Sequence, residues 1–296
     1  MSEFINFYLI PGFVLGSIYA LGAIGITMTF GILRFANFGH GETMTLGVYI
    51  TWSLIQYTGL HPVVLLPIAM VLTVMVALAL DKGFYKPLRN SPTIILVIAS
   101  FGLMLMVRSV IQFFWGVQLK SVLPGIQRPM LLLDYLRVSP KHLMIIGGAI
   151  ILMFLVHYLL TYTKIGKAMR AMSDSPELAQ LTGINTEMVV RATWVVGASL
   201  ACAAGVFLAI DTQVETMMGF KLLLPMFAAA ILGGLGRPYG AMVGGLVIGM
   251  AEELSSYHWI GTGPLLNPGY KQGLAFAIMI AMLLWRPSGL FKGKVF

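Results

Sequence analysis

Charged residues are scarce in this 296-residue chain: Asp, Glu, Lys and Arg make up 10% of it, whereas 58% of the residues are hydrophobic. A soluble domain carries about 25% charged residues. Apolar runs of about 20 residues recur along the whole length, and a helix needs about this length to cross a bilayer. The sequence therefore predicts an all-α, polytopic membrane bundle in which residues 1–296 form a single transmembrane domain.

Cysteine and catalytic signatures are also almost absent. Cys202 is the only cysteine, so there is no disulfide framework. We find no His/Cys cluster with metal-ligand spacing, no paired catalytic carboxylates and no nucleophile elbow, and we predict neither a metal site nor an enzyme. The two Gly-Lys pairs, at 166–167 and 293–294, lack the rest of a phosphate-binding loop. We therefore expect no nucleotide or other cofactor on this chain. The net charge of +8 comes without a basic face carrying interleaved aromatic residues, which argues against nucleic acid as a partner.

The apolar runs divide the chain into nine segments, one of which is short for a full crossing. The short one, 43–57, would begin inside the membrane or form a broken helix, and eight crossings would remain if it does not span. The nine segments are 9–33, 43–57, 62–80, 93–115, 142–163, 190–210, 220–235, 241–256 and 272–285.

Lys and Arg are distributed unevenly among the loops between these segments. With all nine segments crossing and the N-terminus outside, twelve of the 19 basic residues fall on the inside, six fall on the outside, and Arg108 lies within a segment. Cytoplasmic loops carry an excess of Lys and Arg. The distribution therefore predicts an N-out, C-in topology and places the polar stretch 164–189 in the cytoplasm.

This polar stretch contains the signals of a short, capped helix. Asp174 or Ser175 can accept hydrogen bonds from the first free N–H groups, Pro176 suits the first helical position, and Glu177 complements the positive end of the dipole. Gly183 is a natural terminator. A helix over about 176–183, held at the membrane surface, is either a docking element or part of an ordinary solvated loop, and the residues alone leave both open.

The spacing within this helix resembles a motif of transport proteins. Glu177, Ala179 and Gly183 stand at positions i, i+2 and i+6, as in the Glu-Ala-Ala…Gly signature of ABC importer permeases, although Leu178 stands where that signature has Ala. The resemblance implies that the helix couples to an ATPase subunit through Asp174, Ser175, Glu177, Ala179 and Gly183.

A few polar residues and glycines within or between the apolar segments are candidates for a translocation pathway. His40 and Glu42 lie on glycine-flanked backbone after Asn37, and broken helices with exposed backbone groups form transporter sites. A tight cytoplasmic turn capped by Asn37 and Glu42 is the alternative. We expect Arg108 to extend toward the membrane surface, since a charge left unpaired in the membrane is costly. The glycines of a second break complete the set: Gly233, Gly234 and Gly236.

Four blocks of sequence, in order, are similar to one family. They are Gly16-Ser-Ile-Tyr-Ala-Leu-Gly-Ala-Ile-Gly, Thr29-Phe-Gly-Ile-Leu-Arg-Phe-Ala-Asn-Phe-Gly-His-Gly-Glu, Arg170-Ala-Met-Ser-Asp with Gly183-Ile-Asn, and Ala230-Ile-Leu-Gly-Gly-Leu-Gly-Arg-Pro-Tyr-Gly-Ala. They resemble the LivH-type permeases of branched-chain amino-acid ABC importers.

This resemblance implies a permease of the bacterial inner membrane that imports leucine, isoleucine and valine by alternating access. It also implies a homologous LivM-type permease subunit, two cytoplasmic ABC ATPases that hold ATP-Mg, and a periplasmic solute-binding protein as partners. Related systems carry urea, short amides or other amino acids. An ion-coupled transporter, with Glu42, His40 and Arg108 as the ion site, and a channel are the other classes that the sequence leaves open.

Overall fold

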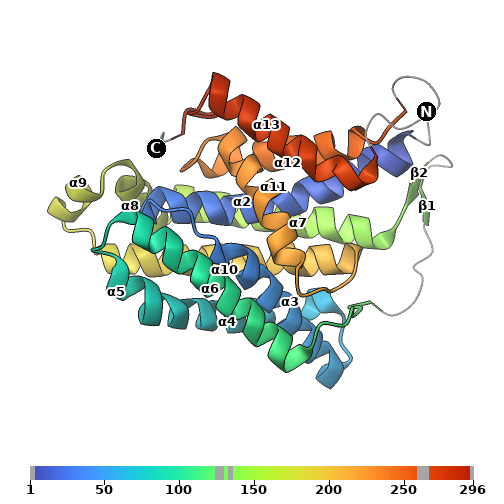
Figure 1. Cartoon of the computed structure of the whole chain (residues 1–296), viewed down its shortest axis with the longest axis horizontal. Helices are drawn as coiled ribbons and strands as arrows, with labels where there is room; N and C mark the ends of the chain where they lie inside the picture. Colours follow the sequence, from blue (N-terminus) through green and yellow to red (C-terminus); the bar gives the residue numbers. More distant parts are fainter. Residues whose placement is uncertain (1–3, 124–129, 133–135, 259–266, 294–296) are drawn as a thin grey trace.

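In the computed structural model, which describes residues 4–123, 130–132, 136–258 and 267–293, the long helices run roughly along one axis (Figure 1). The short helices α5 (Lys86–Leu88), α8 (Lys164–Asp174) and α9 (Pro176–Leu181) lie at one end, here called the α9 end. A hairpin of β1 (Met130–Leu132) and β2 (Leu136–Val138) lies at the other, the hairpin end. Apart from this hairpin, the regular structure of the described residues is helical, as the sequence predicted.

Each of the nine predicted segments corresponds to a helix. These are α2 (Ile10–Leu33), α3 (Gly39–Thr58), α4 (Pro62–Leu80), α6 (Thr93–Trp115), α7 (Pro140–Tyr162), α10 (Thr186–Asp211), α11 (Met218–Gly233), α12 (Pro238–Leu254) and α13 (Lys271–Trp285). Short π- and 3₁₀-helical turns adjoin them at η1 (Ile5–Leu9), η2 (Asp81–Tyr85) and η3 (Pro268–Tyr270). Within the described residues, five helical stretches are long and apolar enough to cross a membrane: Ile5–Leu33, Pro62–Leu88, Thr93–Trp115, Pro140–Tyr162 and Thr186–Asp211.

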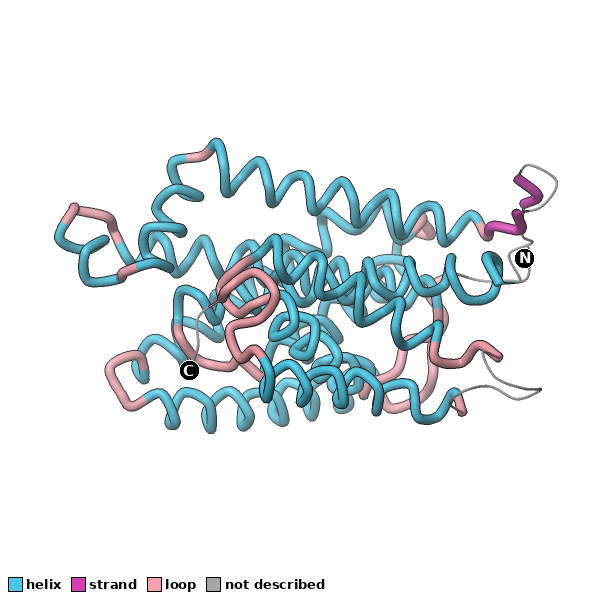
Figure 2. Tube along the Cα trace, turned by 90° about the horizontal axis from the view of Figure 1, so that it is seen from above, coloured by secondary structure: helices cyan, strands magenta, loops and turns pink. Residues whose placement is uncertain are grey.

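Helix α2 forms the centre of the bundle and is buried along nearly its whole length. It packs against α7, α10, α11 and α12, whereas α4, α6 and α7 turn large apolar side chains outward. Figure 2 shows α7 leaving the strands along one edge of the bundle, and the chain around α9 projecting beyond the opposite end. A helix that is apolar on all sides is a core or membrane helix. Helix α2 is buried by other helices of this chain and is central, whereas α4, α6 and α7 expose apolar side chains and are peripheral.

Small residues allow α2 and α12 to approach each other closely. Gly12, Gly16 and Ala20 of α2 recur every four residues; Gly16 and Ala20 face Gly249 and Gly245 of α12, and Gly12 lies against Met250. A Cβ atom added to Gly249 would lie 2.3 Å from the Cα of Gly16, so neither backbone leaves room for a side chain. Small residues at this spacing are a common packing device between membrane helices, because dispersion contacts rather than the hydrophobic effect hold such helices together in lipid.

We expect Gly249→Val to separate α2 from α12 and to destabilise the fold by about 1–3 kcal/mol or more, as overpacking does. The measurement is the thermal unfolding temperature of the purified chain in detergent. Gly102→Val on α6 is the matched control, because a Cβ atom at Gly102 meets nothing within 4 Å. Equal unfolding temperatures for the two variants would contradict the close α2–α12 contact.

After α2, the chain turns back into the bundle before α3 begins. Arg34 ends α2 in the left-handed conformation, with a φ of 57°, and His40 reaches the middle of α2, where its ring lies against Gly25. Helix α3 thus starts part-way along α2. The helix starts earlier than the predicted segment, because residues 39–42 already belong to it, and a start inside the membrane stays a prediction.

Candidate translocation site at the starts of α3 and α11

Two helices begin side by side within the bundle. The backbone N–H of Gly219, at the start of α11, donates to Oγ1 of Thr45 in α3 at 3.1 Å. A Cβ atom on Gly219 would lie 1.9 Å from the carbonyl oxygen of Gly41, so the contact depends on glycine. Each helix start carries the positive end of a helix dipole. Discontinuous helices whose N-termini meet inside the membrane form the solute sites of several transporter folds.

A buried ion pair lies at this junction. Glu42, in the first turn of α3, is fully buried, and its Oε1 accepts from Nε of Arg108 in α6 at 2.9 Å and also from a terminal guanidinium nitrogen. The side chain of Arg108 is 12% exposed. The expectation that Arg108 extends to the membrane surface is therefore wrong: a buried carboxylate within reach offers a better partner than distant water.

One carboxylate oxygen of the ion pair has no hydrogen-bond donor. Oε2 of Glu42 is buried and has no hydrogen-bond partner among the described residues. The guanidinium of Arg108 also lies 4.8 Å from the centre of the Phe220 ring, at cation–π distance. Phe220 is in the first turn of α11, so α3, α6 and α11 all contribute to this one site.

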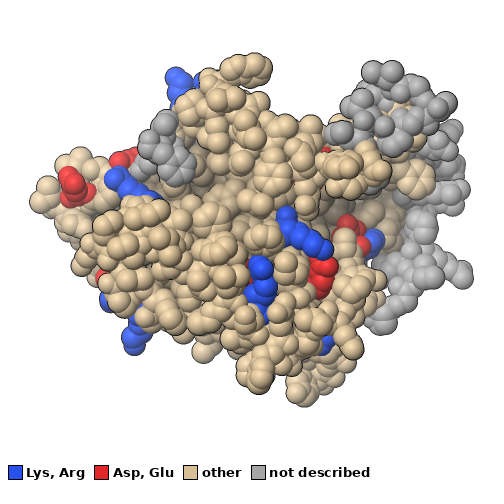
Figure 3. Space-filling model, viewed as in Figure 1, with Lys and Arg blue, Asp and Glu red and all other residues tan. Residues whose placement is uncertain are grey.

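Polar contacts continue from the ion pair toward the hairpin end. Gln112 of α6 donates from Nε2 to Oγ1 of Thr216 at 3.4 Å, and Lys221 of α11 pairs with Glu215. A cavity of about 460 Å³ opens beside Glu215 and Lys221. Figure 3 shows a group of charged side chains in the middle of the visible face, surrounded by uncharged surface, with further charged side chains toward the α9 end. Charged residues at membrane depth line solute or ion paths or pair with each other, so this face is the best candidate for the solute path.

The short helix α9 has defined ends. Oγ of Ser175 accepts from the backbone N–H of Leu178 at 3.5 Å and caps its start, whereas Asp174 is the last residue of α8. At its other end, Gly183 has a φ of +82° and donates to the carbonyl of Gln180, and Ile184 donates to that of Ala179. These two bonds form a Schellman motif. The predicted capped helix is confirmed, and Ser175 is the capping residue.

Helix α9 turns apolar side chains to the outside. Leu181 is 82% exposed and Leu178 is 64% exposed, while Ala179 is buried beneath them. The helix projects beyond the bundle (Figure 2). Two leucines exposed on a short, projecting helix are a typical contact surface for another protein.

Comparison with known proteins identifies the chain. Residues 8–283 match the family described as the branched-chain amino acid transport system / permease component. The chain belongs to this family. The matched residues include the ion-pair site at the starts of α3 and α11 and also the projecting helix α9.

Individual relatives match this permease over nearly its whole length. It is 32% identical to the high-affinity branched-chain amino acid transport system permease protein LivH of Escherichia coli K12, over 98% of this chain and 97% of that protein. It is 30% identical to the permease protein BraD of Pseudomonas aeruginosa, over 95% and 94% of the two chains, and 31% identical to a probable LivH of Methanocaldococcus jannaschii, over 94% and 89%.

One solved structure shares the fold of the permease. It is described as PsaBC from Streptococcus pneumoniae in complex with Fab, and its chain superposes with a TM-score of 0.52 at 14% sequence identity, covering 97% of this chain and 95% of that one. At this level of identity the likeness concerns the fold alone.

Asn37 and His40 lie near the helix junction in the permease, but their side chains are used to hold the chain in place. Oδ1 of Asn37 accepts from the hydroxyl of Tyr85 at 2.9 Å and from the backbone N–H of Gly39 at 3.0 Å. The ring of His40 is buried and lies against Gly25 in α2. Both residues fix the start of α3, and therefore the position of Glu42; a direct contact with solute stays a prediction for them.

The glycines of the second break lie at the α9 end, apart from the ion pair. Gly236 faces Gly31 near the end of α2, and Gly234 has a φ of +106°. The segment after α13 packs on this turn, where Phe291 donates to the carbonyl of Gly233 at 3.2 Å. The structure therefore does not bring Gly233, Gly234 and Gly236 together with Glu42, and their place on the pathway stays a prediction.

Five residues of the polar face were not singled out from the sequence: Gln112, Glu215, Thr216, Phe220 and Lys221. They come from α6, from α11 and from the segment before α11, and they meet only in the folded chain. One signal was available, because Lys221 stands at the beginning of the apolar segment 220–235, next to a polar loop. Such a residue extends one helix turn into the membrane region and needs a partner there.

Proposed function

We propose that this chain is the inner-membrane permease subunit of an ATP-driven importer of branched-chain amino acids. The observation that carries the proposal is the family match over residues 8–283, together with relatives of the same length that are named as branched-chain amino acid permeases. The ABC ATPases, the periplasmic binding protein and a homologous second permease are the partners that such an importer requires. ATP-Mg would be held by the ATPase subunits.

The charge distribution supports an orientation with the α9 end in the cytoplasm. Most basic residues of the loops belong to this end, including Arg34, Lys82, Lys164 and Arg237. Positive charge marks the cytoplasmic side. All nine long helices would then cross or enter the membrane, with α3 and α11 starting part-way through it, and the binding protein would dock at the hairpin end.

The ion-pair site suits the charged part of an amino acid. An α-amino acid carries one carboxylate and one ammonium group, and the site offers one guanidinium and one carboxylate together with two positive helix ends. The solute carboxylate would face Arg108 and the helix starts, and its ammonium group would face the unpartnered oxygen of Glu42. The Phe220 ring is an apolar neighbour for a branched side chain.

Helix α9 would transmit the ATPase motion. The exposed pair Leu178 and Leu181 fits a groove on an ATPase subunit, and Ser175 and Gly183 keep the helix short and rigid between its caps. Closing of the ATPase dimer would move α9 and α8, and α8 contacts α2, α7 and α10 in the bundle. Rigid-body motion of packed helices around a fixed site is a recurrent mechanism of alternating access.

Uptake in cells tests the proposed substrate. In a strain that lacks this chain but keeps the rest of the transport system, restoring it should restore accumulation of labelled leucine, isoleucine and valine. Vanadate should block this accumulation and a protonophore should not. Accumulation of labelled urea or acetamide in place of the three amino acids would contradict the proposed substrate, and inhibition by the protonophore alone would contradict ATP coupling.

A further inference from the structure

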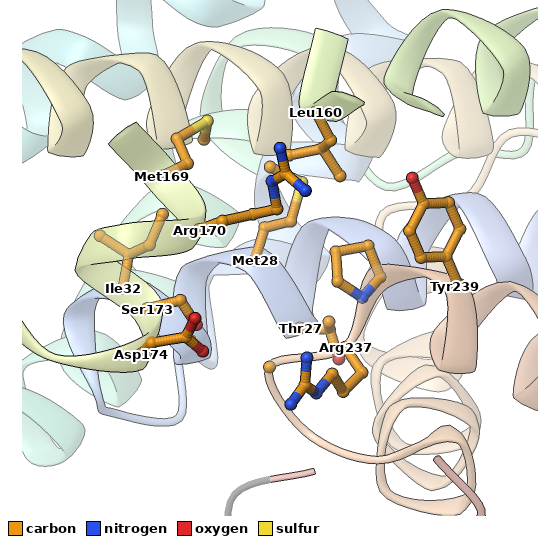
Figure 4. A pocket seen from close by; sticks show the side chains of 13 residues that line it. Thr27, Met28, Ile32, Leu160, Met169, Arg170, Ser173, Asp174, Arg237 and Tyr239 are labelled. Carbon is orange, nitrogen blue, oxygen red and sulfur yellow. The ribbon is translucent and has the colours of Figure 1, made fainter. Parts of the chain in front are cut away.

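A small cavity at the α9 end lies apart from the ion-pair site. It has a volume of about 120 Å³ and lies between α2, α7, α8 and the turn before α12 (Figure 4). Its polar lining consists of Thr27, Arg170, Ser173, Asp174, Arg237 and Tyr239. No residue of α9 and no residue of the ion-pair site lines it.

Two of the lining residues are arginines without a salt bridge. Arg170 of α8 and Arg237 before α12 have no ion pair or hydrogen bond from their side chains within the described part of the chain. Asp174 is the single acidic residue of the lining, so the cavity keeps a surplus of positive charge. Guanidinium groups are well suited to bind phosphate, because they present several donors in one plane.

A buried hydroxyl on the cavity wall also lacks a partner. Thr27 is fully buried in α2, and its Oγ1 has no hydrogen-bond partner among the described residues. Other buried threonines in the helices of this chain donate to the carbonyl four residues earlier, as Thr29, Thr51 and Thr73 do. An unpartnered buried hydroxyl is costly, so its position on this wall indicates a ligand that accepts or donates a hydrogen bond there.

The backbone adds positive potential at the same place. The 17-residue helix α12 begins with Pro238 on the cavity wall, and its first turn points the positive end of the dipole toward the cavity. Helix starts of this kind are general binding sites for phosphate groups. A buried hydroxyl, two exposed arginines and a helix start thus line one small cavity.

The surroundings of the cavity indicate a lipid rather than a free anion. Tyr158 and Tyr162 of α7 and Tyr239 of the cavity wall are all exposed, and the Tyr239 hydroxyl lies 2.9 Å from Nδ1 of His157. Farther along α7, Phe154 is also exposed on the outer face. Tyrosines above an apolar surface mark the level of the lipid head groups. Basic cavities between helices at this level on the cytoplasmic side bind anionic head groups.

The geometry points to a binding site for the phosphate group of an anionic phospholipid in this cavity. The phosphate accepts hydrogen bonds from Arg170 and Arg237, and Thr27 donates to one of its oxygens. Because Arg170 belongs to α8 and Arg237 to the start of α12, the bound head group ties the segment that precedes α9 to the centre of the bundle. The site requires the α9 end to face the cytoplasmic leaflet but does not require any particular solute.

Native mass spectrometry of the purified permease assembly tests this site, with phosphatidylglycerol and phosphatidylethanolamine of identical acyl chains as probes. We expect tighter binding of phosphatidylglycerol, and a loss of about 30-fold in its affinity for Arg170→Gln/Arg237→Gln, since each arginine near the head groups contributes about 1 kcal/mol, or roughly fivefold. Thr27→Val, which removes only the hydroxyl, should lose affinity by a smaller factor. Arg286→Gln is the matched control, an exposed arginine at the same end and outside the cavity.

Two results would contradict a lipid site in this cavity. Unchanged phosphatidylglycerol binding by the double variant, or equal binding of the two lipids by the wild type, would overturn the site. Displacement of the lipid by millimolar inorganic phosphate would overturn the lipid as its ligand and indicate a free anion. The unfolding temperature of each variant in lipid-free detergent shows whether the variant is folded. If the double variant does not fold, the loss of lipid affinity in Thr27→Val still tests the site. A permease that transports another solute would leave all these results unchanged.

Discussion

Replacing Arg108 by glutamine should abolish transport and destabilise the permease by about 3–5 kcal/mol, the cost of leaving one member of a buried ion pair without its partner. The carboxylate of Glu42 is fully buried, and among the described residues its Oε1 is paired with Arg108 alone. The measurements are the unfolding temperature of the purified assembly and its initial rate of leucine uptake. An uptake rate close to that of the wild type would contradict a role for the pair.

The double variant Glu42→Gln/Arg108→Gln separates a structural role from a role in transport. Two neutral amides can hydrogen-bond to each other, so most of the lost stability should return, because no buried charge is left alone. Transport should stay lost if the charges bind the solute. Lys86→Gln is the control, since the Lys86–Glu187 pair is exposed at the α9 end, away from the ion-pair site, and such pairs contribute about 0–1 kcal/mol. Recovery of transport together with stability would mean that the pair only holds the helices together.

Gly183→Pro should uncouple ATP hydrolysis from transport while leaving insertion and assembly of the bundle intact. Proline cannot adopt the φ of +82° found here, and it removes the N–H group that donates to Gln180. The end of α9 would unravel and Leu181 would leave its position. The measurements are binding of the ATPase subunits and solute-stimulated ATP hydrolysis, and both should fall at least about tenfold, as expected for the loss of an anchor residue at an interface.

A second glycine provides a matched control for Gly183→Pro. Gly59 follows α3 in the same left-handed conformation, with a φ of +66°, and donates to Ile55, and a Cβ atom at either glycine meets nothing within 4 Å. Gly59→Pro should therefore disturb a helix end to the same degree but away from α9, and binding of the ATPase subunits should be unchanged. Equal loss of binding in both variants would contradict a specific role for α9.

The order and extent of the helices could be predicted because a membrane helix is specified locally, by a run of apolar residues of sufficient length. The exception is the start of α3. Gly39–Glu42 looks like a polar turn in the sequence, but folded it is the first turn of a helix, because Gly25 leaves space for the His40 ring and Asn37 caps the backbone. That arrangement depends on contacts between residues far apart in the sequence.

The same distinction applies to the two functional regions. The residues that cap α9 lie within ten positions of one another, so the sequence predicts the caps. The structure adds that Leu178 is exposed, so a leucine in place of the alanine of the signature needs no space in the core. The partner of Arg108 lies 66 residues away in the chain and on another helix, and no local pattern identifies it. The arginines of the lipid cavity come together in the same way, from α8 and the turn before α12.

Transport by the complete assembly in liposomes shows whether this permease moves a branched-chain amino acid across the membrane by ATP hydrolysis on partner subunits. With ATP and Mg²⁺ available to the ATPase subunits and the binding protein on the opposite side, labelled leucine should accumulate above its external concentration, and the Gly183→Pro assembly should not accumulate it. Accumulation driven by a proton gradient in the absence of ATP, to the same level in both assemblies, would contradict ATP-driven transport through α9.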